Sequence, residues 1–341
     1  MNILIISPTQ SGIGGIAQHV QGLTKFLKKN GHKVEIISSE NTFTLPIKGL
    51  KNPSFMISSF LKSKFKKNFD IVHAHNIPAA LAMKNTTGKK ILSLHGIFSQ
   101  QIDELHGKVT GIISAKYEKN ALEWADAITV ISKEAYDYYS KLGYKVFQVP
   151  NAIDISSLNP NEKRQFEKQI IFAGRLSAEK GIDTLIEIAE KLPETINLLI
   201  LGTGPEKQKI QNLATRKENI HFLGYCNKDE TISLIRGSDI LIQPSLQEAI
   251  SSTILEAMAC GTAVIASNVG GNIEIITNQK NGILLESQRA ELFTNSIIEL
   301  FENSQKRKSL VNEASHSIKN YDWSEVGNLY MNIYKSLLKS E

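Results

Sequence analysis

Two glutamates stand eight positions apart in segment 248–256, Glu-Ala-Ile-Ser-Ser-Thr-Ile-Leu-Glu, just before Ala-Met-Ala-Cys-Gly and a strand-like run at 262–267. We expect Glu248 in a loop and Glu256 on the opening turns of a helix. A carboxylate accepts two hydroxyl hydrogen bonds at once, as the diol of a ribose offers. The spacing therefore favours binding of a sugar nucleotide. The alternative for Glu256 is structural, a capping box in which Thr253 is the N-cap.

Two cations follow the first predicted strand of the second half, in Gly174-Arg-Leu-Ser-Ala-Glu-Lys-Gly181. Arg175 leaves the strand, and Lys180 lies at the start of the next predicted helix. Cations beside a helix N-terminus favour binding of a diphosphate. The alternative is a surface ion pair with Glu179.

A glycine-rich segment, Ser11-Gly-Ile-Gly-Gly15, opens a predicted helix from Ile16. Glycines let the backbone approach an anion, and a helix N-terminus offers free N–H groups to a phosphate. Gly12-x-Gly14-x-x-Ala17 also matches the dinucleotide fingerprint, with Glu40 after the next strand. A nicotinamide-dependent oxidoreductase is therefore an alternative class of function.

Three histidines lie in or after predicted strands of the first half. His73 and His75 alternate on one strand, where we expect His73 inside the sheet and His75 at its open end. No cysteine or acid completes a metal site, so none is predicted. His95 ends the next strand and could donate to a sugar oxygen, although a plain strand-end histidine is an equal alternative.

Continuous apolar runs alternate with helical patterns, which predicts parallel strands buried on both faces. Two sets of six strands imply two Rossmann-like domains facing each other across a cleft, with ligands beyond the carboxyl ends of the strands. We place the domains at 1–152 and 153–320. The tail, 321–341, carries a stripe that predicts a helix packed back on the first domain: Trp323, Val326, Leu329, Tyr330, Ile333, Tyr334 and Leu337.

The charge of the 341 residues is unevenly distributed. Residues 1–150 hold 19 lysines, no arginine and 10 acids, a net charge of +9, so the remainder carries −4. Such an excess can draw a domain to anionic lipid, and a solvated face is the alternative. Nucleic acid is a weaker alternative as a partner for this charge. With two cysteines, no basic leader and no apolar run of about 20 residues, we expect a cytoplasmic protein, peripheral at most on the inner face of the membrane.

Taken together, these motifs resemble the retaining family-4 glycosyltransferases of the GT-B fold. Further matching segments are Val149-Pro-Asn-Ala-Ile-Asp154, Leu201-Gly-Thr-Gly-Pro-Glu206, Ala125–Ser132 and Val269–Glu274. The resemblance implies a hexose or N-acetylhexosamine transferred from a UDP- or GDP-linked donor to a glycan or lipid-linked acceptor in cell-envelope or glycoconjugate biosynthesis. It implies no cofactor and no metal. A phosphorylase or epimerase of the same fold is a further alternative.

The resemblance also implies roles for individual residues. Arg175 and Lys180 would hold the donor diphosphate, Glu256 the ribose, and Glu248 the donor sugar. Gly14 and Gly15 would approach the diphosphate and the acceptor, and His95 would lie near the reacting centre. The other implied donor-binding residues are Asn151, Gly204, Ser252 and Thr253. The family often has glycine after the first glutamate, whereas this chain has Ala249-Ile-Ser-Ser252, which leaves the sugar open.

Overall fold

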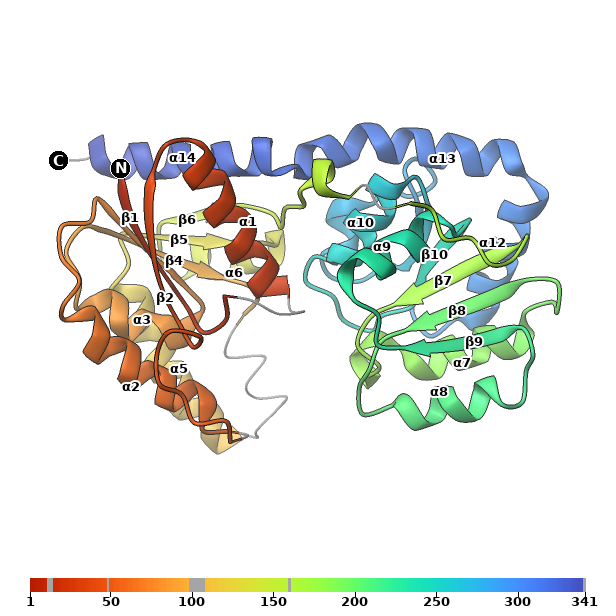
Figure 1. The fold of residues 1–341 in the computed structure, drawn as a ribbon, viewed down its shortest axis with the longest axis horizontal. Helices are drawn as coiled ribbons and strands as arrows, with labels where there is room; N and C mark the ends of the chain where they lie inside the picture. Colours follow the sequence, from red (N-terminus) through yellow and green to blue (C-terminus); the bar gives the residue numbers. More distant parts are fainter. Residues whose placement is uncertain (11–14, 48, 98–107, 159–160, 340–341) are drawn as a thin grey trace. The chain divides into compact units, whose positions relative to one another are not determined.

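The computed structural model describes residues 1–10, 15–47, 49–97, 108–158 and 161–339, without side chains at 108–114 (Figure 1). The chain divides into two compact units. The first unit comprises Met1–Ala152 with Trp323–Glu341, and the second comprises Ile153–Asp322. None of the described helices combines the length and apolarity needed to cross a membrane.

The first unit is built on a six-stranded parallel sheet in the order β2-β1-β3-β4-β5-β6. Its strands are β1 Asn2–Ser7, β2 Lys33–Ser38, β3 Ile71–His75, β4 Lys89–Leu94, β5 Ala127–Val130 and β6 Val146–Gln148. Its helices are α1 Gly15–Lys29, α2 Lys51–Ser63, α3 Ile77–Lys84, α5 Lys108–Glu123, α6 Lys133–Lys141 and α14 Trp323–Lys339.

The central strands of this sheet are apolar on both faces because helices cover both. In β1, Leu4 and Ile6 pack in a core with α2, α3, α5 and α6. Ile3 and Ile5 point the other way, into a core with α1 and α14. All four are fully buried, as expected for a strand between two helical layers (Figure 1).

The tail helix α14 packs against α1, and two glycines bring the helices close. A Cβ built on Gly22 of α1 would lie 2.0 Å from the indole of Trp323, and one on Gly327 would lie 2.6 Å from the ring of Phe26. The predicted stripe is buried except for Leu329, which is 43% exposed. The prediction for Leu329 was therefore wrong, because it lies beside the stripe and faces solvent.

The second unit repeats the architecture with the strand order β12-β11-β10-β7-β8-β9, again parallel. Its strands are β7 Gln169–Ala173, β8 Asn197–Leu201, β9 Ile220–Gly224, β10 Ile240–Gln243, β11 Ala263–Ser267 and β12 Ile283–Leu285. Its helices are α7 Ile182–Lys191, α8 Lys207–Ala214, α9 Lys228–Arg236, α10 Ser252–Cys260, α11 Asn272–Ile275, α12 Ala290–Glu302 and α13 Ser304–Ser317, with short 3-10 turns at 155–157, 178–180 and 318–321.

Each of the twelve strands coincides with one of the apolar runs expected from the sequence. Helices α7, α8 and α12 share one core with the sheet of the second unit, and α9 and α10 contact its strands from the other face. The expected α/β architecture of two Rossmann-like units is thus confirmed. The hydrogen-bonded sheets hold the carboxyl ends of the strands, and with them the candidate residues, in place.

We predict that Gly22→Ala destabilises the first unit. Alanine favours a helix by about 1 kcal/mol over glycine, but its methyl group would overlap the buried Trp323 indole. Overpacking of this kind costs about 1–3 kcal/mol, so the net effect is a loss of stability. Both tryptophans, Trp124 and Trp323, belong to the first unit, so tryptophan fluorescence during urea unfolding reports on it.

The matched control is Gln21→Ala, a neighbouring exposed position on α1. It should leave the urea midpoint unchanged or raise it slightly. An equal midpoint for Gly22→Ala and the wild type would show that α1 and α14 can separate without cost.

Candidate functional site

The segment that follows β7 carries the two predicted phosphate-binding cations. Lys180 ends a short 3-10 turn, Ala178–Lys180, and Gly181 starts the connection into α7 with a φ of +69°. A Cβ on Gly181 would lie 1.9 Å from the carbonyl oxygen of Pro244, after β10. Only glycine fits this approach, so the loops after β7 and β10 lie against each other.

Lys180 and Glu248 form the central ion pair of these loops. Lys180 Nζ lies 2.8 Å from Glu248 Oε1 and 2.6 Å from Oε2, and the two side chains are 21% and 9% exposed. The hydroxyl of Ser245 donates to Glu248 Oε2 at 3.1 Å, and the amide of Gln243 donates to Ser245 Oγ at 3.0 Å. This chain of contacts fixes the orientation of the Glu248 carboxylate.

The loop after β11 packs on the backbone of Glu248. The N–H of Gly271 donates to the Glu248 carbonyl at 2.9 Å, and Gly270 has a φ of +47°. A Cβ on Gly270 would lie 1.8 Å from that carbonyl oxygen. Three loops, after β7, β10 and β11, thus meet at Glu248.

Arg175 stands apart from this pair. Its side chain is 69% exposed, and its Nη1 lies 3.9 Å from Glu179 Oε1. That distance is too long for a hydrogen bond, so the guanidinium is only loosely paired. Its donors remain accessible to an anionic ligand.

Glu256 lies within α10 and pairs with a lysine of α9. Its carboxylate accepts a hydrogen bond from Lys228 Nζ, and the two side chains are 6% and 44% exposed. Burial raises the pKa of Glu256, while the charge of Lys228 and its hydrogen bond oppose that shift. Glu256 is therefore a largely enclosed carboxylate with one partly exposed cation beside it.

The alternative interpretation of Thr253 and Glu256 as a capping box is wrong. The N-cap of α10 is Ser251, whose side chain accepts a hydrogen bond from the N–H of Ile254 at 3.4 Å. Thr253 is the second residue of the helix, and Glu256 lies beyond the third helical position, where a capping glutamate would be. Three consecutive hydroxyl residues, Ser251 to Thr253, compete for the cap, and the sequence alone did not separate them.

The remaining predicted donor-binding residues of this unit surround the same strand ends. Ser252 and Thr253 are half-buried in the first turn of α10, where backbone N–H groups lack partners inside the helix. Gly204 follows β8, and a Cβ there would lie 2.2 Å from the carbonyl oxygen of Leu176. Gly204 therefore allows close packing of the loops after β7 and β8.

Lys228, Ser245 and Gln243 were not predicted as site residues. Asn227 caps α9 by accepting from the N–H of Glu230 at 2.9 Å, which places Lys228 at the first helical position. The Asn-x-x-Glu pattern could have located this helix start. Nothing in the sequence connects Lys228 with Glu256, 28 positions away.

In the first unit, Gly15 is the exposed first residue of α1, and a Cβ there would meet no atom within 4 Å. Gly14 and most of the dinucleotide-like pattern lie outside the described residues.

His95 belongs to a cluster of four histidines in the first unit. Its Nε2 lies 3.5 Å from His75 Nδ1, and its ring centroid lies 5.2 Å from that of His19 on α1. His73 stacks on His75 with centroids 4.3 Å apart. His95 is half-buried, whereas His75 is fully buried, so the expectation of an open position for His75 was wrong.

The tail helix supplies partners to this cluster. The hydroxyl of Tyr334 lies 2.7 Å from His73 Nδ1, and that of Tyr330 lies 2.9 Å from His19 Nε2. His73 Nε2 lies 2.6 Å from the Ser93 hydroxyl. His73 is therefore a packed sheet residue, as expected, with both ring nitrogens bonded.

Burial keeps these histidines neutral. It lowers the pKa of His73 to about 3, with His95 adding to the effect, and that of His95 to about 4. The pKa of His19 also falls well below its ordinary value through burial and neighbouring histidines, opposed by a side-chain hydrogen bond with Asn151. Asn151 thus lies in the same cluster as His95.

Across the described ranges, no group of histidine, cysteine and acidic side chains has the arrangement of a metal site. The four histidines bond to tyrosine and serine hydroxyls or stack on one another.

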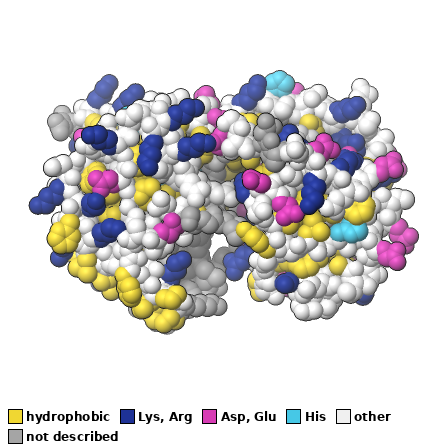
Figure 2. Space-filling view, in the orientation of Figure 1, with side chains coloured by type: hydrophobic (Ala, Val, Ile, Leu, Met, Phe, Trp, Pro, Cys, Tyr) yellow, Lys and Arg dark blue, Asp and Glu magenta, His cyan; other side chains and the backbone are white. Residues whose placement is uncertain are grey.

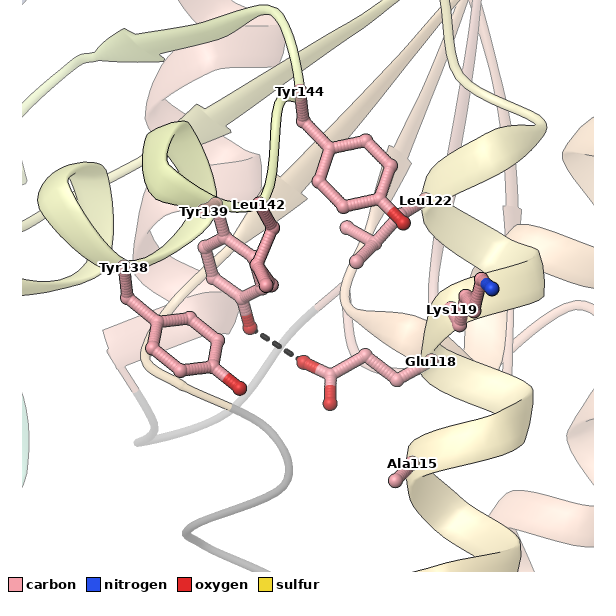
Figure 3. A pocket seen from close by; sticks show the side chains of 8 residues that line it. All are labelled: Ala115, Glu118, Lys119, Leu122, Tyr138, Tyr139, Leu142 and Tyr144. Carbon is pink, nitrogen blue, oxygen red and sulfur yellow. Dashed lines mark hydrogen bonds between the residues drawn. The ribbon is translucent and has the colours of Figure 1, made fainter.

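A separate cavity of about 380 Å³ lies between α5 and α6 of the first unit (Figure 3). The Tyr139 hydroxyl donates to Glu118 Oε1 at 2.5 Å, and Tyr138, Tyr144 and Leu122 complete much of the wall. These residues occupy the later turns of the helices and the segment before β6. Since the helices run antiparallel to the strands, this wall lies toward the amino ends of the strands, whereas His95 follows a carboxyl end.

Two family models match the chain in succession. "Glycosyltransferase Family 4" matches residues 13–157, and "Glycosyl transferases group 1" matches residues 156–317. The two parallel α/β units match the GT-B fold of solved glycosyltransferases. The chain belongs to the family of group 1 and family-4 glycosyltransferases.

Curated relatives align along nearly the whole chain. An uncharacterised glycosyltransferase of Methanocaldococcus jannaschii is 26% identical, with 95% of this chain and 94% of the relative covered. The phosphatidyl-myo-inositol mannosyltransferase of Mycolicibacterium smegmatis is 25% identical, with 99% and 94% covered.

Solved structures share the fold. Sucrose-phosphate synthase from Thermosynechococcus elongatus superposes with a TM-score of 0.84 at 18% identity, and both chains are covered completely. Anabaena HepE, in complex with UDP-glucose, superposes with a TM-score of 0.73 at 18% identity, covering 98% of this chain and all of the other.

We predict that the neutral histidine cluster makes the first unit acid-sensitive. An unfolded histidine has a pKa of about 6.5 and binds a proton below it, whereas folded His73, with a pKa of about 3, does not. The free energy of unfolding therefore falls as pH falls from about 6 to 4. His73→Gln should reduce this slope by about 1.4 kcal/mol per pH unit.

Urea unfolding followed by tryptophan fluorescence at several pH values in this window measures the slope. His32→Gln is the control. Burial also lowers the pKa of His32, but this side chain is only half-buried, so the change in slope should be smaller. Parallel slopes for His73→Gln and the wild type would contradict the assignment of a neutral, buried His73.

We also predict that Lys228→Met destabilises the second unit by about 1–3 kcal/mol. The change leaves the buried Glu256 carboxylate without its cation. Because Lys228 is half-exposed, the loss of unfolding free energy should be smaller than for a fully buried ion pair. Denaturation followed by circular dichroism measures it. Lys228→Met with Glu256→Gln should recover much of the loss, while Lys280→Met, in an exposed pair with Glu313, should change little.

Proposed function

We propose that this glycosyltransferase moves a hexose or N-acetylhexosamine from a UDP- or GDP-linked donor to a glycan or lipid-linked acceptor, with retention of configuration. The observation that carries the proposal is the Lys180–Glu248 pair, held at the strand ends of the second unit by Ser245. The pair combines a cation for a phosphate with a carboxylate for sugar hydroxyls.

The geometry of Lys180 allows it to contact Glu248 and a donor phosphate at the same time. An ammonium group has three N–H donors, and two of its contacts go to the oxygens of Glu248. The third donor is available for a phosphate oxygen. Lys180 would then stabilise the negative charge that develops on the diphosphate as the sugar departs, and the exposed Arg175 would add a second cation.

Glu256 supports recognition of the nucleotide. Its second carboxylate oxygen can accept hydroxyls of the ribose, and Lys228 opposes the rise in the pKa of Glu256 that burial causes. The first turn of α10, with Ser252 and Thr253, would contribute backbone N–H groups to the phosphates. Gly204 keeps the neighbouring loop close.

The first unit would supply the acceptor side. Gly15 is the exposed first residue of α1, and the neutral His95, beside His75, can donate one hydrogen bond to a sugar oxygen near the reacting centre. No side chain is required as a covalent nucleophile, and no metal or other cofactor is proposed. We propose a cytoplasmic location with peripheral contact to the membrane through the lysine-rich part of this unit.

The relatives support a nucleoside diphosphate sugar as the donor and differ in the sugar named. HepE was solved with UDP-glucose, and the mycobacterial relative is named a mannosyltransferase. The family assignment favours glycosyl transfer over the nicotinamide-dependent oxidoreductase. Glycosyl transfer differs from a phosphorylase or epimerase in its products: an epimerase changes the donor without an acceptor, and a phosphorylase requires inorganic phosphate.

Calorimetric titration with UDP- and GDP-sugars and with NAD(H) tests the donor class. We expect binding of one nucleoside diphosphate sugar and none of NAD(H). Proton NMR of the product then gives the anomeric configuration, and an inverted anomer would contradict retention. Binding of NAD(H) alone would overturn the proposal.

We predict that Glu248→Gln and Lys180→Ala each reduce transfer at least about a hundredfold, since charged contacts to the departing diphosphate and sugar are lost. Transfer is measured as release of nucleoside diphosphate in the presence of acceptor. Glu230→Gln and Lys163→Ala, which break an exposed ion pair of the same unit, are the controls and should keep wild-type activity. Near wild-type rates in both site variants would refute the assignment.

A further inference from the structure

The first unit exposes an unusual amount of apolar surface around α2. Seven of the thirteen large hydrophobic side chains that are exposed in the described residues fall within residues 43–65. The most exposed are Phe65 at 86%, Phe43 at 71% and Ile57 at 62%. We call this set the α2 face: Phe43, Leu45, Ile47, Leu50, Ile57, Leu61 and Phe65.

The segment before α2 runs alongside the helix and brings these side chains together. The Ser58 hydroxyl donates to the carbonyl of Phe43 at 2.6 Å, and the N–H of Leu45 donates to Ser54 Oγ at 2.9 Å. Ile57 and Leu61 are four positions apart on α2 and therefore share one side of the helix. The apolar side chains thus form a surface supported by hydrogen bonds.

The segment that carries this surface is basic, and one of its lysines, Lys66, pairs with Glu35 of β2. Residues 41–69 contain six lysines and no acidic residue. Lys64 and Lys67 are exposed beside Phe65, and Lys62 reaches back to Asn41 Oδ1 at 2.9 Å. Figure 2 shows hydrophobic side chains gathered at the lower left, over the region of α2, with dark blue basic side chains next to them.

This combination distinguishes between possible partners. A second copy of the chain would bring two lysine-rich surfaces together, and like charges would oppose the contact. An anionic lipid surface attracts the lysines and accepts the apolar side chains below its headgroups. Helix α2 has 13 residues, which is suited to lying on a membrane and too short to span it.

We propose that the α2 face is a membrane-docking surface that inserts Ile57, Leu61 and Phe65 into an anionic leaflet while the neighbouring lysines bind lipid phosphates. The proposal rests on the proposed function in one respect: docking would give the enzyme access to a lipid-linked acceptor. Docking itself requires neither donor nor chemistry, so it is measured separately from transfer.

Sedimentation of the full chain with vesicles tests the surface. Vesicles of phosphatidylcholine with about one-third phosphatidylglycerol should bind the wild type, whereas pure phosphatidylcholine should bind it at least about tenfold more weakly. Binding should weaken as salt rises. Absence of binding to the anionic vesicles at low salt would overturn the proposal.

Two sets of variants separate the contributions of the apolar residues and the lysines. Ile57→Ser with Leu61→Ser and Phe65→Ser should lower vesicle affinity at least about tenfold. Lys62→Gln, Lys64→Gln and Lys67→Gln should each lower it about fivefold. The matched controls lie elsewhere in the first unit and should bind as the wild type does: Leu142→Ser, Leu329→Ser, Lys141→Gln and Lys145→Gln.

Light scattering, which measures the oligomeric state, distinguishes membrane docking from self-association through the α2 face. A wild-type dimer that becomes a monomer in the serine variants, with unchanged vesicle binding, would assign the face to self-association and overturn membrane docking. Equal loss of vesicle binding in the control variants would show that net charge, and not the α2 face, governs adsorption. Donor hydrolysis without vesicles should be the same in all folded variants.

Discussion

The candidate donor site depends on direct backbone packing between loops at one edge of a parallel sheet. The backbone at Gly181 lies against the carbonyl of Pro244, and the backbone at Gly270 lies against the carbonyl of Glu248. A side chain at either position would separate the loops, because it would have to displace backbone. The ion pair between Lys180 and Glu248 can form only while these loops stay together, so the chemistry of the site rests on residues that carry no chemistry themselves.

The two carboxylates of the motif play different physical roles. Glu248 sits in a loop, accepts hydrogen bonds from Ser245 and Lys180, and is oriented before any ligand arrives. Glu256 is largely buried in α10, where burial raises its pKa and the charge of Lys228 opposes that rise. Each glutamate therefore has its own lysine. A ligand that contacts both carboxylates would meet one prearranged acceptor and one whose charge depends on a neighbouring helix.

Sequence patterns predicted the sheets well because parallel strands buried on both faces are continuously apolar, as in β1, and the stripe on α14 predicted its packing. Lys228 and the tyrosine partners of the histidines were beyond reach, since Tyr334 meets His73 across 261 positions. The helix cap was misplaced because three adjacent hydroxyl residues offered equal local signals. The lysine excess of residues 1–150 was evident from the sequence, but the sequence does not distinguish an exposed apolar side chain from a buried one, so the apolar surface at residues 43–65 was not predicted.

The position of α14 has a consequence for the order in which the protein can mature. Its tyrosines and Trp323 complete the core of a unit whose other elements are encoded before Ile153. During synthesis, one apolar face of the first sheet has α1 but not α14 to cover it while the ribosome makes the entire second unit. The part of this core that α14 completes, around Trp323 and Tyr330 in the finished protein, therefore forms only after the last helix is released, so the first unit matures after the second has been made.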